Sequence, residues 1–89
     1  MKRAVKKTFG DLRRRLGNGI RRHRGRQKRT QMELAELAEL HWRHLQKIEA
    51  GKCNVTLITL ARLSNALGVD ALELLATGPG APMKVRSGP

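Results

Sequence analysis

The sequence predicts an all-α fold in which five short helices form one small compact domain. The chain has 89 residues with one Phe, one Trp and no Tyr, so the core must consist of Leu, Ile, Val and Ala. This composition suits packed helices better than a sheet, which favours aromatic and β-branched residues. Apolar residues also recur at helical spacing between residues that typically begin or end helices. A single cysteine, Cys53, excludes an intrachain disulfide framework and fits a reducing compartment.

The first helix has an uncertain start. Residues 1–8 lack apolar periodicity, which predicts a disordered basic arm. Thr8 and Asp11 have the spacing of a capping residue and its acidic partner. Each glycine weakens a helix by about 1 kcal/mol relative to alanine, so the helix starts either at Phe9 or near Leu16. The apolar residues of this helix are Leu12, Leu16 and Ile20, and its glycines are Gly10, Gly17 and Gly19.

Two further helices joined by a tight turn follow. Thr30 and Glu33 form a capping box that opens a helix over about 30–38. After a turn at residues 39–41, a third helix covers about 42–50 and ends at Gly51, a residue suited to a left-handed cap. The apolar positions that point inward from both helices are Leu34, Ala35, Ala38, Leu40, Leu45 and Ile48.

The last two helices are also bounded by capping residues. Thr56 caps the fourth helix and Gly68 ends it, while Asp70 with Glu73 opens a short fifth helix that runs through Leu75. The apolar face of the fourth helix comprises Leu57, Leu60, Leu63, Ala66 and Leu67. Residues 77–89 are rich in Gly and Pro, which predicts a disordered tail. The chain therefore divides into an arm (1–8), a helical domain (9–76) and a tail (77–89).

The net charge of the chain lies entirely in its first third. Residues 1–29 contain 13 Lys and Arg residues and one acid, whereas the remaining residues contain six basic and six acidic side chains. A basic segment of this kind indicates a polyanionic partner such as nucleic acid. The alternative is a solvated segment whose charges only repel one another.

The outward face of the helix at 42–50 suggests what the partner is. It carries Trp42, Arg43, Gln46 and Lys47, side chains that can contact base edges when a helix enters the major groove of DNA. Arg43 suits guanine and Gln46 suits adenine; the alternatives are a phosphate contact for Arg43 and a solvated position for Gln46. Trp42 either contacts a thymine methyl group or sugar edge, or anchors this helix on the preceding one.

The sequence lacks the residue patterns that are typical of enzymes, metal sites and membrane proteins. There is no Ser/His/Asp arrangement, no pair of acids and no phosphate-binding glycine loop, so we expect neither an enzyme nor a bound cofactor. The residues His23, His41, His44 and Cys53 lack the spacing of a zinc site, so no metal is expected. No stretch approaches 18 apolar residues and no secretory signal is recognisable, which predicts a cytoplasmic protein without membrane contact.

The combined motifs resemble those of the Xre, or lambda-repressor-like, helix-turn-helix family. The matching segments are Thr30-Gln31, Leu34-Ala35, Leu40, Leu45-Gln46-Lys47-Ile48-Glu49-Ala50-Gly51, and Leu60 followed by Leu63-Ser64-Asn65-Ala66-Leu67-Gly68-Val69. They cover about Leu16 to Leu75 without gaps. The resemblance implies a five-helix domain that binds double-stranded DNA, with the helix at 42–50 as its recognition helix.

The resemblance also implies roles for individual residues. Arg24 and Glu49 match an internal ion pair, and the arm matches basic arms that wrap DNA in some relatives. The residues implied to contact the DNA backbone are Gln31, Lys52, Asn54, Lys6, Lys7, Arg29 and His44; Arg29 alternatively emerges from an apolar slot. The sequence departs from the family pattern at Glu39, where the turn usually has Gly, and at His41, a poor cap where Ser or Thr is usual.

Apolar residues at the end of the domain predict a homodimer. Leu72, Leu74 and Leu75 exceed what a short terminal helix can bury in its own protomer, so Leu72 and Leu75 are expected at the dimer contact. The alternative is that this helix only fills its own core, as expected for Leu74. A dimer would place two recognition helices about 34 Å apart on a palindromic operator. The hypothesis is therefore a sequence-specific transcriptional regulator, a repressor or an activator. The alternatives are a non-specific basic nucleic-acid binder and a protein-interaction module or antitoxin that uses the same fold.

Overall fold

A computed structural model describes residues 1–76, and the predicted disordered tail at 77–89 lies outside the described residues. The described part is all-helical and has no strand, which confirms the predicted fold class. Its five helices are α1 (Arg3–Arg26), α2 (Gln31–Leu37), α3 (Trp42–Glu49), α4 (Leu57–Leu67) and α5 (Ala71–Ala76).

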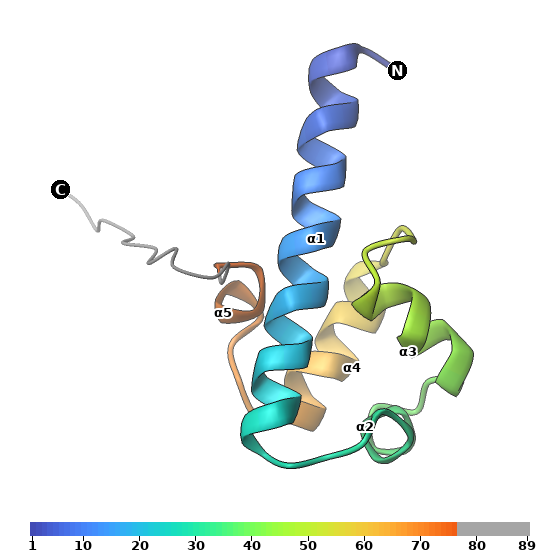
Figure 1. Cartoon of the computed structure of the whole chain (residues 1–89), viewed down its shortest axis with the longest axis vertical. Helices are drawn as coiled ribbons and strands as arrows, with labels where there is room; N and C mark the ends of the chain where they lie inside the picture. Colours follow the sequence, from blue (N-terminus) through green and yellow to red (C-terminus); the bar gives the residue numbers. More distant parts are fainter. Residues whose placement is uncertain (77–89) are drawn as a thin grey trace, which may run out of the picture.

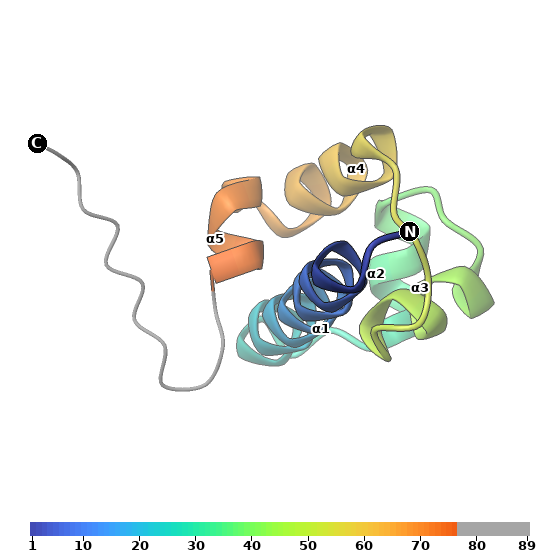
Figure 2. The same ribbon diagram turned by 90° about the horizontal axis from the view of Figure 1, so that it is seen from above.

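The long helix α1 is the axis around which the other helices pack. In Figures 1 and 2, α5 lies on one side of α1 while α2 and α3 lie on the other, and α4 completes the bundle. The lower half of α1 contacts these helices, and its N-terminal half extends beyond them (Figure 1). The fully buried large side chains of the core are Ile20, Leu34, Leu45, Ile48, Leu63 and Leu74. The inward faces predicted for α2 and α3 are confirmed, with Leu40 partly buried.

Two glycines of α1 allow neighbouring backbones to approach it closely. A Cβ atom at Gly17 would lie 2.5 Å from the carbonyl oxygen of Glu49, at the end of α3. At Gly19 it would lie 2.0 Å from the carbonyl oxygen of Leu74, in α5. Sequence analysis assigned these glycines only a helix-weakening effect. In the folded chain they are the positions where α3 and α5 rest on α1.

The predicted flexible arm at residues 1–8 is wrong, because α1 begins at Arg3. Both predicted starting points, Phe9 and Leu16, are therefore wrong as well. Val5 extends the apolar spacing of Phe9 and Leu12 toward the N-terminus, a repeat that the sequence analysis overlooked. Thr8 does not cap a helix; its hydroxyl donates to the carbonyl oxygen of Ala4 at 3.0 Å, inside α1.

Capping hydrogen bonds set the boundaries of the shorter helices. At α2, the Thr30 amide donates to Glu33 Oε1 at 2.8 Å and the Glu33 amide donates to Thr30 Oγ1 at 3.0 Å, which confirms the capping box. Thr56 caps α4, as predicted. His41 was expected to be a poor cap, but its Nδ1 accepts the amide hydrogen of Arg43 at 3.1 Å. An imidazole nitrogen thus replaces the usual hydroxyl oxygen.

One residue predicted to lie in the core is exposed. Leu57, the first residue of α4, has 82% of its surface exposed. The buried side of α4 follows Thr59, Leu63 and Leu67, which are four residues apart and share one helix face. Leu57 precedes Thr59 by two residues, which places it on the opposite side of the helix.

The turn between α2 and α3 contains a residue with unfavourable backbone geometry. Glu39, where the family pattern usually has Gly, has φ +58°, in the left-handed region. The left-handed conformation costs an L-residue about 1–2 kcal/mol, and glycine adopts it without strain.

Replacing Glu39 with glycine should therefore raise the free energy of unfolding by about 0.5–1 kcal/mol, because the greater freedom of glycine in the unfolded chain offsets part of the relief. Urea denaturation followed by circular dichroism measures this change. The matched control is Glu36→Gly inside α2, which should lower stability by about 1 kcal/mol. Equal losses from both changes would contradict strain at Glu39.

Candidate nucleic-acid interface

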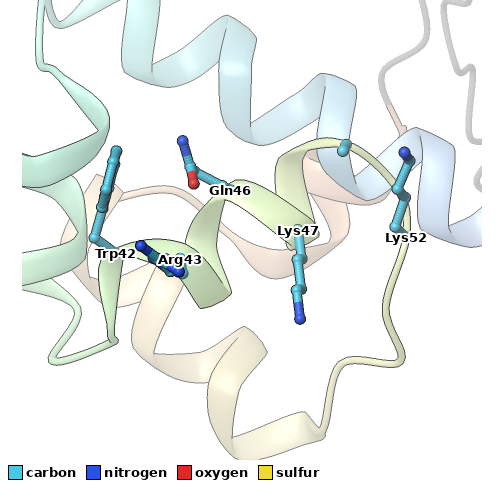
Figure 3. Close-up of a pocket in the computed structure, with 6 residues that line it drawn as sticks. Trp42, Arg43, Gln46, Lys47 and Lys52 are labelled. Carbon is cyan, nitrogen blue, oxygen red and sulfur yellow. The ribbon is translucent and has the colours of Figure 1, made fainter.

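The outward side of α3 presents a group of exposed polar and aromatic side chains. Leu45, Ile48 and Glu49 are buried on the inner side of the helix. Four predicted base-contacting residues lie on the opposite side together with Lys52 from the following loop, where they line a shallow hollow (Figure 3): Trp42, Arg43, Gln46 and Lys47. This arrangement can present several hydrogen-bond donors to a DNA groove at once.

Trp42 is partly covered and partly exposed, a position compatible with either of the two alternatives that the sequence left open. Its exposed fraction is 38%, so more than half of the residue is covered. It borders a second hollow that is lined from α1 and α2 by Arg24, Gln31 and Met32, among others. The indole therefore sits at the seam between α2 and α3 and still presents an edge to the outside.

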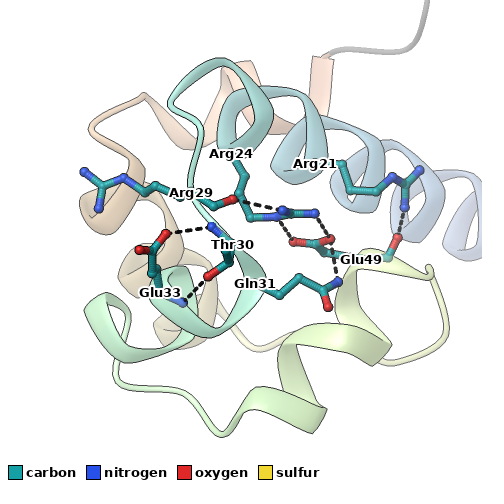
Figure 4. A network of polar contacts seen from close by, with 7 residues as sticks. All are labelled: Arg21, Arg24, Arg29, Thr30, Gln31, Glu33 and Glu49. Carbon is teal, nitrogen blue, oxygen red and sulfur yellow. Dashed lines mark hydrogen bonds and ion pairs between the residues drawn. The ribbon is translucent and has the colours of Figure 1, made fainter.

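A buried network of polar contacts holds α3 in place (Figure 4). The side chain of Glu49 is 2% exposed and receives two hydrogen bonds from Arg24, Nε to Oε2 at 2.8 Å and Nη2 to Oε1 at 2.9 Å. Arg21 also donates to the backbone carbonyl of Glu49. The predicted ion pair is confirmed, and it connects α1 to the C-terminal end of α3. The two arginines also offset the negative end of the α3 dipole, where a carboxylate alone would be unfavourable.

The network includes two residues that the family resemblance placed at the DNA backbone. Gln31 Nε2 donates to Glu49 Oε1 at 2.9 Å, so its amide nitrogen connects the start of α2 to α3. The carbonyl of Arg29 accepts a hydrogen bond from Arg24 Nη1 at 3.0 Å. The side chain of Arg29 is partly buried and its Nε has no hydrogen-bond partner within residues 1–76. Arg21 was missed by sequence reasoning, although its position three residues before Arg24 was a usable signal.

Basic residues of α1 extend the positive surface beyond α3. Gly51, in the loop that carries Lys52, packs against the α1 backbone, and a Cβ atom there would lie 3.5 Å from the Cα of Arg14. The loop is therefore adjacent to the basic stretch of α1. Lys6 and Lys7 are exposed farther along the same helix, where Lys7 pairs with Asp11 at 3.2 Å. This contact lowers the pKa of the Asp11 carboxyl.

Two further residues predicted to contact the DNA backbone lie outside α1. Asn54 is exposed and His44 is partly buried.

The described residues contain neither a metal site nor a membrane-spanning helix in addition to this interface. Cys53 is a free, partly buried thiol whose pKa is raised by burial. Within residues 1–76, no group of three or more His, Cys, Asp or Glu side chains is placed to hold a metal ion. No helix in that part is both long and apolar enough to cross a membrane.

The two residues predicted at a dimer contact differ in burial. Leu72 on α5 is 73% exposed, whereas Leu75 is partly buried and packs against the core. Leu74, between them in sequence, is fully buried and fills the core of its own protomer. The described chain thus leaves Leu72 as the exposed apolar side chain of α5.

The two helices, their tight turn and the exposed face of the second helix define the class of helix-turn-helix DNA-binding proteins. Comparisons with known proteins agree. The profile of a family described as "Helix-turn-helix domain" matches residues 9–77. This chain belongs to that family, which agrees with the Xre-like helix-turn-helix resemblance of its motifs.

Two relatives have sequences that match most of the chain. An uncharacterized HTH-type transcriptional regulator, y4dJ from Sinorhizobium fredii, is 33% identical over 76 residues, covering 85% of this chain and 99% of the relative. The control protein C.SmaI from Serratia marcescens is 34% identical over 67 residues, covering 75% and 80%.

Solved structures share the fold. The restriction-modification controller protein C.AhdI from Aeromonas hydrophila has a TM-score of 0.67 at 29% identity and covers 70% of this chain and 94% of its own. The hypothetical transcription factor NHTF from Neisseria has a TM-score of 0.69 at 31% identity, covering 72% and 74%.

Proposed function

We propose that this protein is a sequence-specific transcriptional regulator that inserts α3 into the major groove of double-stranded DNA. The observation that carries the proposal is the exposed set on α3, in which Arg43 and Gln46 can pair with base edges. Trp42 and Lys47 flank them. The buried network at Glu49 supports this function because it fixes the orientation of α3, which base-specific contacts require.

Phosphate contacts surround the base-contacting face in this proposal. The DNA backbone near α3 is contacted by Lys52, Asn54 and His44. Near the start of α2 it is contacted by Arg29 and Gln31. Lys6 and Lys7 extend the contact along the DNA from α1, now as part of a helix and not of a flexible arm. Such contacts set affinity and orientation without carrying sequence information.

We further propose that the protein acts as a homodimer on an imperfect palindrome. The exposed Leu72 supports this assembly, because an apolar side chain at the end of a domain gains by burial against a second copy. Occupancy of the operator would block or recruit RNA polymerase. The likeness to C.SmaI and C.AhdI favours a controller among the regulator types that share this fold.

Selection of bound sites from random duplex DNA tests the proposal directly. With the full chain at physiological salt, we expect enrichment of a palindrome whose half-sites are about one helical turn apart. Tight binding without an enriched motif would instead support a non-specific binder, which the net charge of +12 also allows.

Two substitutions should separate base contacts from phosphate contacts. Arg43→Ala should weaken binding to the selected operator by about 1–3 kcal/mol and leave binding to random DNA nearly unchanged. Lys52→Ala should weaken both about equally and reduce the salt slope by about one. Fluorescence anisotropy over a salt series measures these quantities. Equal losses on both DNAs from Arg43→Ala would make Arg43 a phosphate contact.

The alternative of a protein-interaction module makes a different prediction for Trp42. If the exposed indole edge were a hot spot for a protein partner, Trp42→Ala would abolish that complex and leave DNA binding intact. The proposed regulator instead loses operator affinity on this change, because the indole borders the base-contacting residues.

A further inference from the structure

The N-terminal half of α1 carries an apolar stripe that residues 1–76 of its own protomer leave open. Val5, Phe9 and Leu12 follow one another at intervals of four and three residues, in line with the buried Leu16. This spacing places them on one face of the helix. They line a hollow together with Ala4 and Thr8, and this part of α1 stands clear of the other helices (Figure 1). Val5 is 52% exposed.

The stripe continues into an apolar groove at its base. The groove has a volume of about 240 Å³ and is shared by three helices and the α3–α4 loop. Its apolar lining comprises Phe9, Leu12, Leu16, Val55, Leu57, Leu60 and Leu75. The large exposed fraction of Leu57 belongs to this same surface. The stripe on α1 and the groove share Phe9 and Leu12 and together form one apolar niche.

The charges beside the stripe indicate which kind of partner surface can bind to it. Lys6 and Arg13 flank it on one side, and the guanidinium of Arg13 lies over the Phe9 ring at 4.3 Å from the centroid. Arg13 Nε is buried and has no hydrogen-bond partner within residues 1–76. The same stripe on a second copy would bring like charges together, so two α1 helices do not suit one another.

Helix α5 of a second copy complements the stripe, because it is apolar and carries the opposite charge. Its exposed Leu72 lies between Asp70 and Glu73, both exposed, and residues 70–76 contain no basic side chain. Leu75, three residues after Leu72, lines the groove in its own protomer. The acidic apolar surface and the basic apolar niche are therefore adjacent in each copy, as a two-fold interface with reciprocal contacts requires.

We infer that the niche, formed by Val5, Phe9 and Leu12 together with the groove at the base of the stripe, receives α5 of a second copy, with Leu72 as the inserted side chain. This inference rests on the dimer proposed above and specifies its contacts. Two equivalent contacts form, α1 of each protomer against α5 of the other. Asp70 and Glu73 of one copy then lie beside Lys6 and Arg13 of the other.

Sedimentation equilibrium of the full chain tests the contact. Val5→Glu buries a carboxylate in the interface and should raise the dimer dissociation constant about tenfold or more. The matched control is Leu37→Glu on α2, because Leu37 is 51% exposed and the change in charge is the same. It should leave the dissociation constant unchanged. A dimer unaffected by Val5→Glu would overturn the inference.

Mixing two variants identifies which helices meet. Leu72→Arg should also weaken the dimer, because it brings a cation against Lys6 and Arg13. A mixture of the Val5→Glu and Leu72→Arg proteins forms a mixed dimer in which one α1–α5 contact is wild type. We therefore expect the mixture to dimerise more tightly than either variant alone. If α1 met α1 and α5 met α5, no contact would be restored, and a mixture no tighter than both variants would overturn the inference.

Binding to DNA with a single half-site separates this inference from the proposed function. Each variant retains α3 and should bind a half-site as the wild-type protein does, which also shows that it is folded. A wild-type protein that stays monomeric in solution and on a palindrome would overturn both the dimer and the inference. A wild-type dimer that fails the mixing test would overturn the inference alone.

Discussion

Gly19→Ala should destabilise the domain, although alanine favours helices. Alanine in place of glycine gains about 1 kcal/mol of helix propensity. The added Cβ, however, would lie 2.0 Å from the carbonyl oxygen of Leu74, so α5 must move away from α1. Overpacking of this kind typically costs about 1–3 kcal/mol, and here a rigid backbone atom has to shift while the fully buried Leu74 loses its fit. We expect a net loss of about 2 kcal/mol.

Thermal denaturation followed by circular dichroism measures this loss. For a domain of this size, 2 kcal/mol corresponds to a decrease in Tm of roughly 8–16 °C. Gly25→Ala is the matched control in the same helix, because no atom lies within 4 Å of its added Cβ. It should raise stability by up to about 1 kcal/mol. If both variants gained stability, α5 would not rest on α1 at Gly19.

Glu49→Gln should have the second large effect, because it removes the charge that compensates Arg24. The two hydrogen bonds between these side chains measure 2.8 and 2.9 Å, and the Glu49 side chain is almost completely buried. Breaking a buried pair by changing one partner costs about 3–5 kcal/mol. Arg24 retains partial exposure, so we expect about 3 kcal/mol, measured by urea denaturation. Operator affinity should fall too, since Gln31 and Arg24 orient α3 through this carboxylate.

An exposed acid and a double replacement provide the controls. Glu36→Gln on the surface of α2 should change stability by less than about 0.5 kcal/mol. Replacing both partners, as Arg24→Met with Glu49→Leu, should cost less than the sum of the single changes, because no buried charge is left unpaired. Additive losses would show that the two side chains act independently, contrary to the network in Figure 4.

Local signals in the sequence predicted the short helices well. Thr30, Thr56 and Asp70 each bind an amide two or three residues away, so their effect needs no distant partner. The same holds for Gly51 and Gly68, whose positive φ ends α3 and α4. His41 was misjudged because residue preferences describe an average and do not exclude an imidazole acceptor.

Signals that depend on distant residues were harder to interpret. The α1 glycines suggested a weak or late helix start, yet the helix begins at Arg3. Leu57 matched a helical repeat but lies outside the buried face, which only the packing of Thr59 and Leu63 defines. The apolar stripe at Val5 was overlooked because basic residues surround it in the sequence.

Capping and periodicity were sufficient to place the four shorter helices and the outward side of α3, because these signals act within one segment of the chain. The Arg24–Glu49 ion pair was expected from the family resemblance. Packing between distant segments, in contrast, requires glycine at Gly19 and leaves an apolar niche on α1 beside α5. Both depend on the approach of residues more than 50 positions apart in the chain, Gly19 and Leu74 among them. No local preference encodes such a distance, since it results from how all five helices pack together.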